Sequence, residues 1–164
     1  MKHFLFICFA CVVLMACQAK ETPKQFSEKA LNDTFVSLDG EVLSFSSILN
    51  KYKGKTIFID VWASWCKDCL EGMPNVKELQ KQNKDIVYLF LSLDKTTESW
   101  KKGIEKYDVQ GEHYFMQSGW KGDFGEFLNL DWIPRYLVVD ENQNIILYKA
   151  IKVTDNNLKE VLKK

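Results

Sequence analysis

The pattern of apolar and polar positions divides the chain into short strands and helices. Residues 56–62 and 86–91 are nearly continuous apolar runs rich in β-branched and aromatic side chains, which is typical of strands covered on both faces. Between them, apolar residues recur at three-residue steps from Leu70 to Leu79. This spacing predicts an amphipathic helix over residues 67–84. The centre of the chain therefore has a strand–helix–strand order.

Weaker patterns on both sides of this unit predict further elements. Asp39-Gly40 interrupts a loose alternation and favours a tight turn, so we expect a hairpin within residues 34–45. The other expected elements are helices at 46–52, 97–107 and 123–128, strands at 113–116, 135–140 and 144–149, and a last helix that Asp155 caps. This order of strands and helices indicates one α/β domain.

The N-terminus has the pattern of an export signal. A short positive start, Met1 to His3, precedes an uncharged run from Phe4 to Ala16. That run is shorter than the roughly 20 residues that span a bilayer, and it is typical of a secretory signal, with a short signal-anchor as the alternative. The polar stretch that follows predicts a tether. We therefore divide the chain into a signal at 1–16, a tether at 17–30 and a domain at 31–164.

The end of the apolar run resembles a bacterial lipoprotein box. It reads Leu14-Met15-Ala16-Cys17, with a small residue before the cysteine and an aliphatic residue two positions earlier. The resemblance implies cleavage before Cys17, lipidation of its sulfur, and a position on the cell envelope facing the periplasm or the exterior of a bacterium. A plain signal cut nearby, which would leave Cys17 a free thiol, is the alternative.

Charge and composition exclude several classes of partner. Twenty-two basic residues balance 22 acidic ones, so nothing favours binding to nucleic acid. Arg135 is the only arginine, which argues against bidentate recognition of phosphates by several arginines. Apolar residues make up 46% of the chain, enough for a core.

The strongest chemical signal is the pair Cys66 and Cys69 where the predicted strand meets the predicted helix. Residues i and i+3 of a helix lie on one face, close enough for a disulfide. The N-terminal N–H groups and the helix dipole stabilise a thiolate, which lowers the pKa of Cys66. We therefore expect Cys66 to be the nucleophile and Cys69 the resolving thiol.

Other uses of two cysteines at this spacing fit less well. A structural zinc site needs four ligands, and the mature chain offers only His113 and Cys17 besides this pair. Haem attachment needs a histidine where Leu70 stands. A purely structural disulfide stays open. We expect no metal and no cofactor beyond the redox-active disulfide.

Three separate segments resemble thioredoxins. The segment Asp60-Val61-Trp62-Ala63-Ser64-Trp65-Cys66-x-x-Cys69 is similar to their active-site strand and helix start, Pro74 to their kink proline, and Ile133-Pro134 to their cis-proline loop. An apparent insertion between Leu93 and Trp132, with the export signal, indicates the membrane-anchored TlpA/ResA-like branch. The resemblance implies a thioredoxin fold: a central mixed β-sheet flanked by helices, with an N-terminal β-hairpin and a central insertion.

The resemblance also implies roles for matched residues. Asp60, whose pKa should rise in a buried strand, would help to deprotonate Cys69. Pro134 would take the cis form against the disulfide, with the Ile133 backbone pairing a substrate strand, and Trp65 would be an exposed apolar contact. For Asp60, the alternative is a carboxylate that bonds to the backbone or to a lysine. For Pro134, the alternative is a trans proline that starts a strand. We expect Trp62 to pack beneath the site or simply in the core, and we assign the tryptophans at positions 100, 120 and 132 to core or surface packing.

Two positions depart from the family pattern. The pair between the cysteines is Lys67-Asp68, and Lys67 should favour the Cys66 thiolate while Asp68 opposes it, so we expect no extreme oxidant. Many membrane-anchored relatives carry a glutamate two residues before the kink proline. Here that position is Gly72, with Glu71 beside it, so the role of that glutamate is not carried over.

These observations predict an exported, lipid-anchored, monomeric thiol–disulfide oxidoreductase. Reductase, oxidase and isomerase share these residues and differ in reduction potential, and reduction of protein disulfides is the favoured direction. The resemblance implies a membrane thiol-relay protein as its electron donor. A non-catalytic binding lipoprotein with the same fold is one alternative. A thiol peroxidase is another, although that family places Thr or Ser where Ala63 stands.

Overall fold

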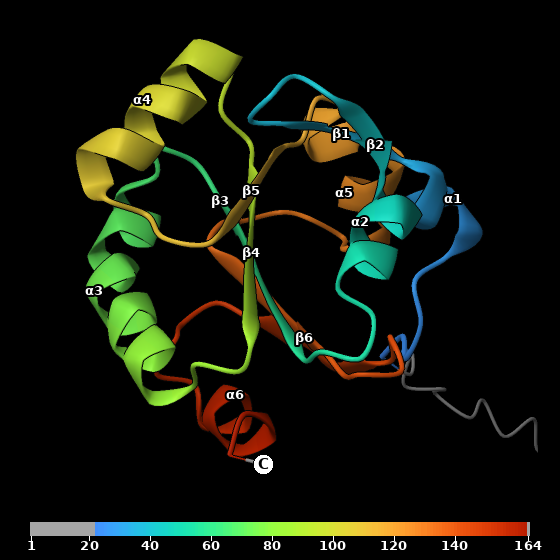
Figure 1. The fold of residues 1–164 in the computed structure, drawn as a ribbon, viewed down its shortest axis with the longest axis vertical. Coiled ribbons are helices and arrows are strands. Elements are labelled where there is room, and N and C mark those ends of the chain that lie inside the picture. Colours follow the sequence, from blue (N-terminus) through green and yellow to red (C-terminus); the bar gives the residue numbers. More distant parts are fainter. Residues whose placement is uncertain (1–21, 164) are drawn as a thin grey trace, which may run out of the picture.

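A seven-stranded mixed sheet forms the centre of the protein, with helices on both faces (Figure 1). The computed structural model describes residues 22–163, so the predicted signal and Cys17 lie outside the described residues. The strand order is β2-β1-β5-β4-β3-β6-β7. The strands are β1 (Thr34–Ser37), β2 (Val42–Ser44), β3 (Ile57–Trp62), β4 (Val87–Ser92), β5 (Glu112–Phe115), β6 (Arg135–Val139) and β7 (Ile145–Ala150).

Helices lie on both sides of this sheet and at one end of the domain. In Figure 1, α3 and α4 lie on one side, α1, α2 and α5 on the other, and α6 at the C-terminal end. Within residues 22–163, none of the helices is long and apolar enough to cross a membrane. The helices are α1 (Glu28–Asn32), α2 (Phe45–Lys51), α3 (Lys67–Gln82), α4 (Thr97–Tyr107), the 3₁₀ turn η1 (Gly119–Lys121), α5 (Asp123–Phe127) and α6 (Asn156–Val161).

The strand β3 is the middle of the core, and its pairing positions the site. All six of its residues are buried, as the continuous apolar pattern predicts. It pairs parallel with β4 and antiparallel with β6, with Val61 opposite Arg135. Because β6 begins where β3 ends, the segment that precedes Arg135 reaches the start of α3.

The predicted elements are present, with their ends shifted by one or two residues. The hairpin forms at Asp39-Gly40, where Gly40 has a φ of +88°, and Thr96 and Asp155 cap α4 and α6. The segment that we expected as an insertion contributes α4, β5, η1 and α5, and β5 pairs with both β1 and β4. The sequence pattern did not reveal α1 or η1.

The boundary of the predicted tether needs a correction. We placed residues 17–30 in the tether, but Phe26 and Ala30 are buried in the core. Phe26 lies 4.9 Å from Phe45 and 6.0 Å from Phe124, measured between ring centroids. One aromatic residue in a polar segment has no periodicity, so the pattern could not place it. The packed domain therefore includes residues from Phe26 onward.

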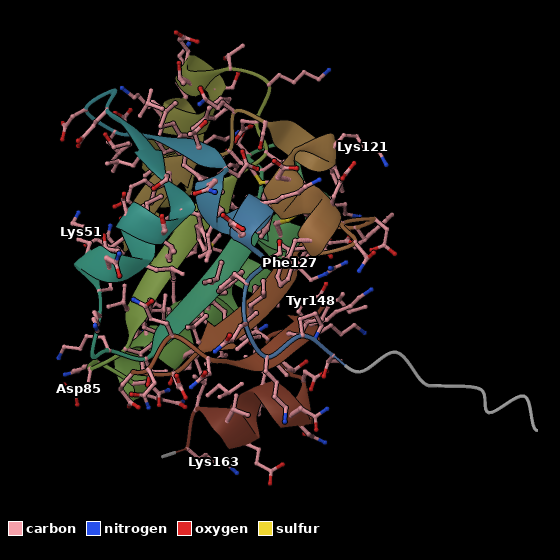
Figure 2. All side chains as sticks on the ribbon, turned by 90° about the vertical axis from the view of Figure 1, so that its right-hand side faces the viewer. Lys51, Asp85, Lys121, Phe127, Tyr148 and Lys163 are labelled. Carbon is pink, nitrogen blue, oxygen red and sulfur yellow. A yellow bond between two sulfur atoms is a disulfide. The ribbon has the colours of Figure 1, made fainter. Side chains whose placement is uncertain are left out.

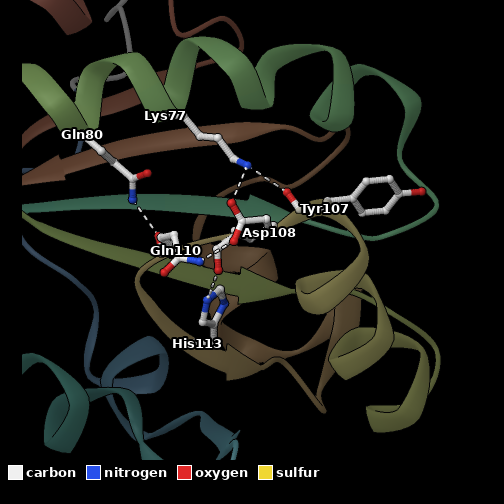
Figure 3. Close-up of polar contacts among 7 residues, drawn as sticks. Lys77, Gln80, Tyr107, Asp108, Gln110 and His113 are labelled. Carbon is white, nitrogen blue, oxygen red and sulfur yellow. Dashed lines mark hydrogen bonds and ion pairs between the residues drawn. The ribbon is translucent and has the colours of Figure 1, made fainter.

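Polar contacts fix the loop between α4 and β5 on α3 (Figure 3). The Lys77 ammonium donates to the Tyr107 carbonyl at 3.1 Å and lies 3.2 Å from the Asp108 carboxylate. Gln80 donates to the Gln110 carbonyl at 2.6 Å, and the Gln110 amide donates to Asp108 at 2.6 Å. These bonds attach the start of β5 to the C-terminal half of α3.

Candidate active site

The two predicted redox cysteines lie at the junction of β3 and α3. Cys66 is the N-cap of α3, and both cysteines are buried, with 5% and 2% of their surface exposed. They form a disulfide with their Cα atoms 5.3 Å apart. The backbone N–H of Cys69 donates to the Cys66 sulfur at 3.1 Å. The same N–H would stabilise a thiolate on Cys66 after reduction.

The segment before β6 reaches the other side of the disulfide. The Ile133–Pro134 peptide bond is cis, as expected. The Ile133 carbonyl oxygen lies 3.6 Å from the Cys66 sulfur. The sulfur carries no proton in the disulfide, so this is a contact; the reduced thiol could donate to that oxygen.

Asp60 is a buried carboxyl in the middle of β3. Only 1% of it is exposed, and its Oδ1 has no hydrogen-bond partner. Burial raises the pKa of Asp60 well above its ordinary value. No lysine among residues 22–163 forms an ion pair with it. The predicted burial of Asp60 is confirmed, and the role towards Cys69 stays a prediction.

Comparison with known proteins decides the family. A family model described as thioredoxin-like matches residues 54–145, more than half of the chain. The chain belongs to the thioredoxin-like family. The match includes β3, the redox pair and the cis-proline, so it rests on the same residues as the geometry.

Three relatives describe the class of this thioredoxin-like protein. It is 25% identical to the thiol-disulfide oxidoreductase ResA of Bacillus cereus, over 89% of this chain and 82% of that one. It is 28% identical to the thioredoxin-like protein YneN of Bacillus subtilis, over 74% and 69%. A solution structure from Bacteroides vulgatus, titled as a thiol-disulfide oxidoreductase, superposes with a TM-score of 0.65 at 29% identity, covering 79% and 82%. The fold and the oxidoreductase class are thereby confirmed.

Tryptophans surround the redox pair of this thioredoxin-like domain. Trp65 is 53% exposed, as predicted, whereas Trp62 is fully buried beneath the site. Trp132, which we had assigned to core or surface packing without a functional role, is 58% exposed. With Trp120 it lines a hollow of about 380 Å³ that includes Trp65, Ile133 and Cys66. Its position directly before Ile133-Pro134 was the signal that could have identified it.

Lys67, between the cysteines, and Gly72, after them, have neighbours that the sequence did not predict. The Lys67 ammonium lies 3.5 Å from the Glu71 carboxylate, and both side chains are exposed. An exposed, paired lysine has little effect on Cys66. A Cβ atom at Gly72 would lie 3.1 Å from the Tyr136 hydroxyl. Tyr136 thus occupies the space beside position 72, and a glutamate would fit there only if Tyr136 moved.

A carboxylate that the sequence analysis missed fixes the loop before Cys66. Asp94, which is 5% exposed, accepts hydrogen bonds from the Ser64 hydroxyl at 2.6 Å, the Ser64 N–H at 3.1 Å and the Ser92 hydroxyl at 2.8 Å. A Cβ at Gly103 of α4 would lie only 2.4 Å from the Ser64 Cβ. Asp94 follows a parallel strand at its carboxyl end, where functional side chains often gather, and this position was the available signal.

Proposed function

We propose that this thioredoxin-like protein is an exported, lipid-anchored reductase of protein disulfides. One observation carries the proposal: the Cys66 sulfur accepts the N–H of Cys69 at the start of α3 and lies 3.6 Å from the Ile133 carbonyl. A nucleophilic sulfur needs a stabilised thiolate, and a substrate strand needs a backbone group to pair with. The Cys69 N–H and the Ile133 carbonyl both lie beside the Cys66 sulfur, so the stabilising group and the pairing group are next to the reacting atom.

The reaction is dithiol–disulfide exchange in two steps. The Cys66 thiolate attacks one sulfur of the substrate disulfide, forms a mixed disulfide and displaces the second substrate sulfur as a thiolate. The Cys69 thiolate then attacks Cys66, which restores the Cys66–Cys69 disulfide and releases the first substrate sulfur. Two electrons pass from the dithiol to the substrate, which leaves as two thiols after protonation by water.

Asp60 is the proposed proton acceptor of the second step. A carboxylate with a raised pKa is a stronger base, so its pKa comes closer to that of the Cys69 thiol. Its Oδ1 has no competing hydrogen-bond partner, which leaves it available. Asp60 would take the Cys69 proton and return it when the disulfide is next reduced.

The proposal includes an electron donor and a location. A reductase in an oxidising compartment needs a supply of electrons, for which we propose a membrane thiol-relay protein. Lipidation of Cys17 would keep the domain beside that donor, in the periplasm or on the exterior. Lys67 is paired with Glu71, so no strong cation raises the oxidising power of the pair. This supports the reductase direction.

Reduction of insulin in the presence of dithiothreitol tests the activity. The wild-type chain should accelerate it, and Cys66→Ser should abolish the acceleration, because serine keeps the shape and lacks the nucleophile. Cys69→Ser should accumulate mixed disulfides between Cys66 and substrates, because the thiol that resolves them is missing. A reduction potential of about −270 mV supports the reductase, and a value of about −120 mV would overturn the direction. Hydrogen-peroxide consumption by the wild type would instead identify a peroxidase, and membrane fractionation of Cys17→Ala tests the anchor.

A further inference from the structure

Two exposed tryptophans flank the nucleophile. Large apolar side chains exposed on a protein surface mark contact sites when they gather in one patch. Trp65 and Trp132 are both more than half exposed, and both line the hollow whose wall includes Cys66. The exposed large apolar side chains among the described residues are Leu38, Val42, Trp65, Trp132 and Ile151.

A buried arginine holds the loop that presents Trp132. Arg135 has none of its surface exposed, and its guanidinium donates to the Leu128 carbonyl at 2.7 Å and to the Asp131 carboxylate at 2.6 Å. Leu128 is the C-cap of α5. Because a buried charge is costly unless it is paired, these bonds are strongly favoured, and they close the segment from Leu128 to Pro134 around one side chain.

The other end of this segment is fixed as well. Tyr148 of β7 packs edge-on against Phe127 of α5, with ring centroids 5.7 Å apart, and its hydroxyl donates to the Phe127 carbonyl (Figure 2). The segment therefore runs between an anchored helix and the buried strand β6. Trp132 stands on a fixed loop, so binding against it costs little conformational entropy.

The charges around the hollow are largely compensated. Lys67 is paired with Glu71, and Asp131 with Arg135 and, at 3.7 Å, with Lys149. Asp68 also lines the hollow and forms no ion pair among the described residues. The three tryptophan rings and Ile133 form the apolar part of the wall, which favours an apolar occupant.

We propose that Trp132 is a specificity-determining residue: with Trp65 it forms a cleft that takes an apolar side chain next to the substrate half-cystine. Cys66 lines the same cleft, so the occupant belongs to the chain that forms the mixed disulfide. The inference rests on the proposed function, because it names the substrate class of that site. Arg135 is a positioning residue that keeps Trp132 beside Cys66.

Paired peptide substrates test this inference. Two disulfide-linked peptides differ only in Phe or Ser beside the cysteine, and kcat/KM is measured for each with wild type, Trp132→Ser, Asp131→Asn and Val42→Ser. Val42 is the matched control, because its side chain is also 58% exposed but lies on β2, away from the hollow. The ratio of the two kcat/KM values within each protein cancels any change in the basal chemistry.

We expect the wild type and Val42→Ser to prefer the Phe peptide by roughly tenfold to a hundredfold, as burial of a phenyl side chain gives. Trp132→Ser should reduce the ratio to near one. Asp131→Asn, which weakens the hold of Arg135, should reduce it partly. The inference is overturned if the wild-type ratio is near one, or if Trp132→Ser keeps the ratio of the wild type. If the wild type does not exchange with dithiothreitol at all, the proposed function fails and this inference fails with it.

Discussion

Replacement of Asp60 by asparagine should remove a pH-dependent loss of stability. The carboxyl is buried, and burial raises its pKa in the folded protein above the value of about 3.9 in the unfolded chain. Above that value the unfolded chain releases the proton that the folded protein keeps. Stability therefore falls as pH rises, by about 1.4 kcal/mol for each pH unit, until pH passes the folded-state pKa.

The asparagine side chain does not ionise, so Asp60→Asn lacks this slope. The difference in the free energy of unfolding between variant and wild type should grow in favour of the variant by about 1.4 kcal/mol for each pH unit. Urea unfolding of both oxidised proteins from pH 4 to pH 8 measures it. Other titrating groups, His113 among them, are present in both proteins and cancel in the difference.

An exposed carboxyl provides the control. Asp85 lies at the surface before β4 (Figure 2), so Asp85→Asn makes the same chemical change outside the core and reports any effect that does not depend on burial. Parallel stability curves for wild type and Asp60→Asn over the whole range from pH 4 to pH 8 would refute the reasoning. They would mean that the buried carboxyl is ionised in the folded protein and has found partners for its charge.

Other changes give expectations for stability. Burial lowers the pKa of His113, whose ring contacts the Val109 carbonyl (Figure 3), so the wild type should lose stability as pH falls below about 6.5. His113→Gln should flatten this loss in thermal unfolding, and an equal loss in both proteins would contradict the assignment. Gly103→Ala places a methyl group against Ser64 and should cost about 1–3 kcal/mol in urea unfolding; no cost would show that α4 shifts freely. Phe124→Ala should cost about 3–5 kcal/mol, because the ring is fully buried among aromatic side chains, and a cost below 1 kcal/mol would indicate that the core collapses into the space.

The centre of the fold and of the site could be predicted from the sequence because the signals there are local. The continuous apolar runs fixed β3 and β4, and the spacing of Cys66 and Cys69 at the end of β3 determined which sulfur caps the helix. Burial of Asp60 followed from its place in an apolar strand, whatever the details of packing.

The remaining features depend on contacts between distant segments. Phe26 enters the core only because Phe45 and Phe124 lie together on one side of the sheet. Asp94 meets Ser64 because two parallel strands end at the same edge. The exposure of Trp132 depends on a loop that one buried arginine closes. None of these is encoded in a periodic pattern or a short motif.

The start of β6 connects the buried part of the site with the proposed recognition of substrate. Successive side chains of a strand point to opposite faces, so Arg135 reaches α5 on one side and Tyr136 reaches Gly72 of α3 on the other. Pro134, directly before them, forms the cis bond beside the disulfide. The antiparallel register sets Tyr136 opposite Asp60 and Arg135 opposite Val61. If β6 shifted by one residue against β3, its side chains would exchange faces, and both Arg135 and Tyr136 would lose their present contacts. The register of one strand thus fixes the environment of Asp60 and the position of Trp132 together.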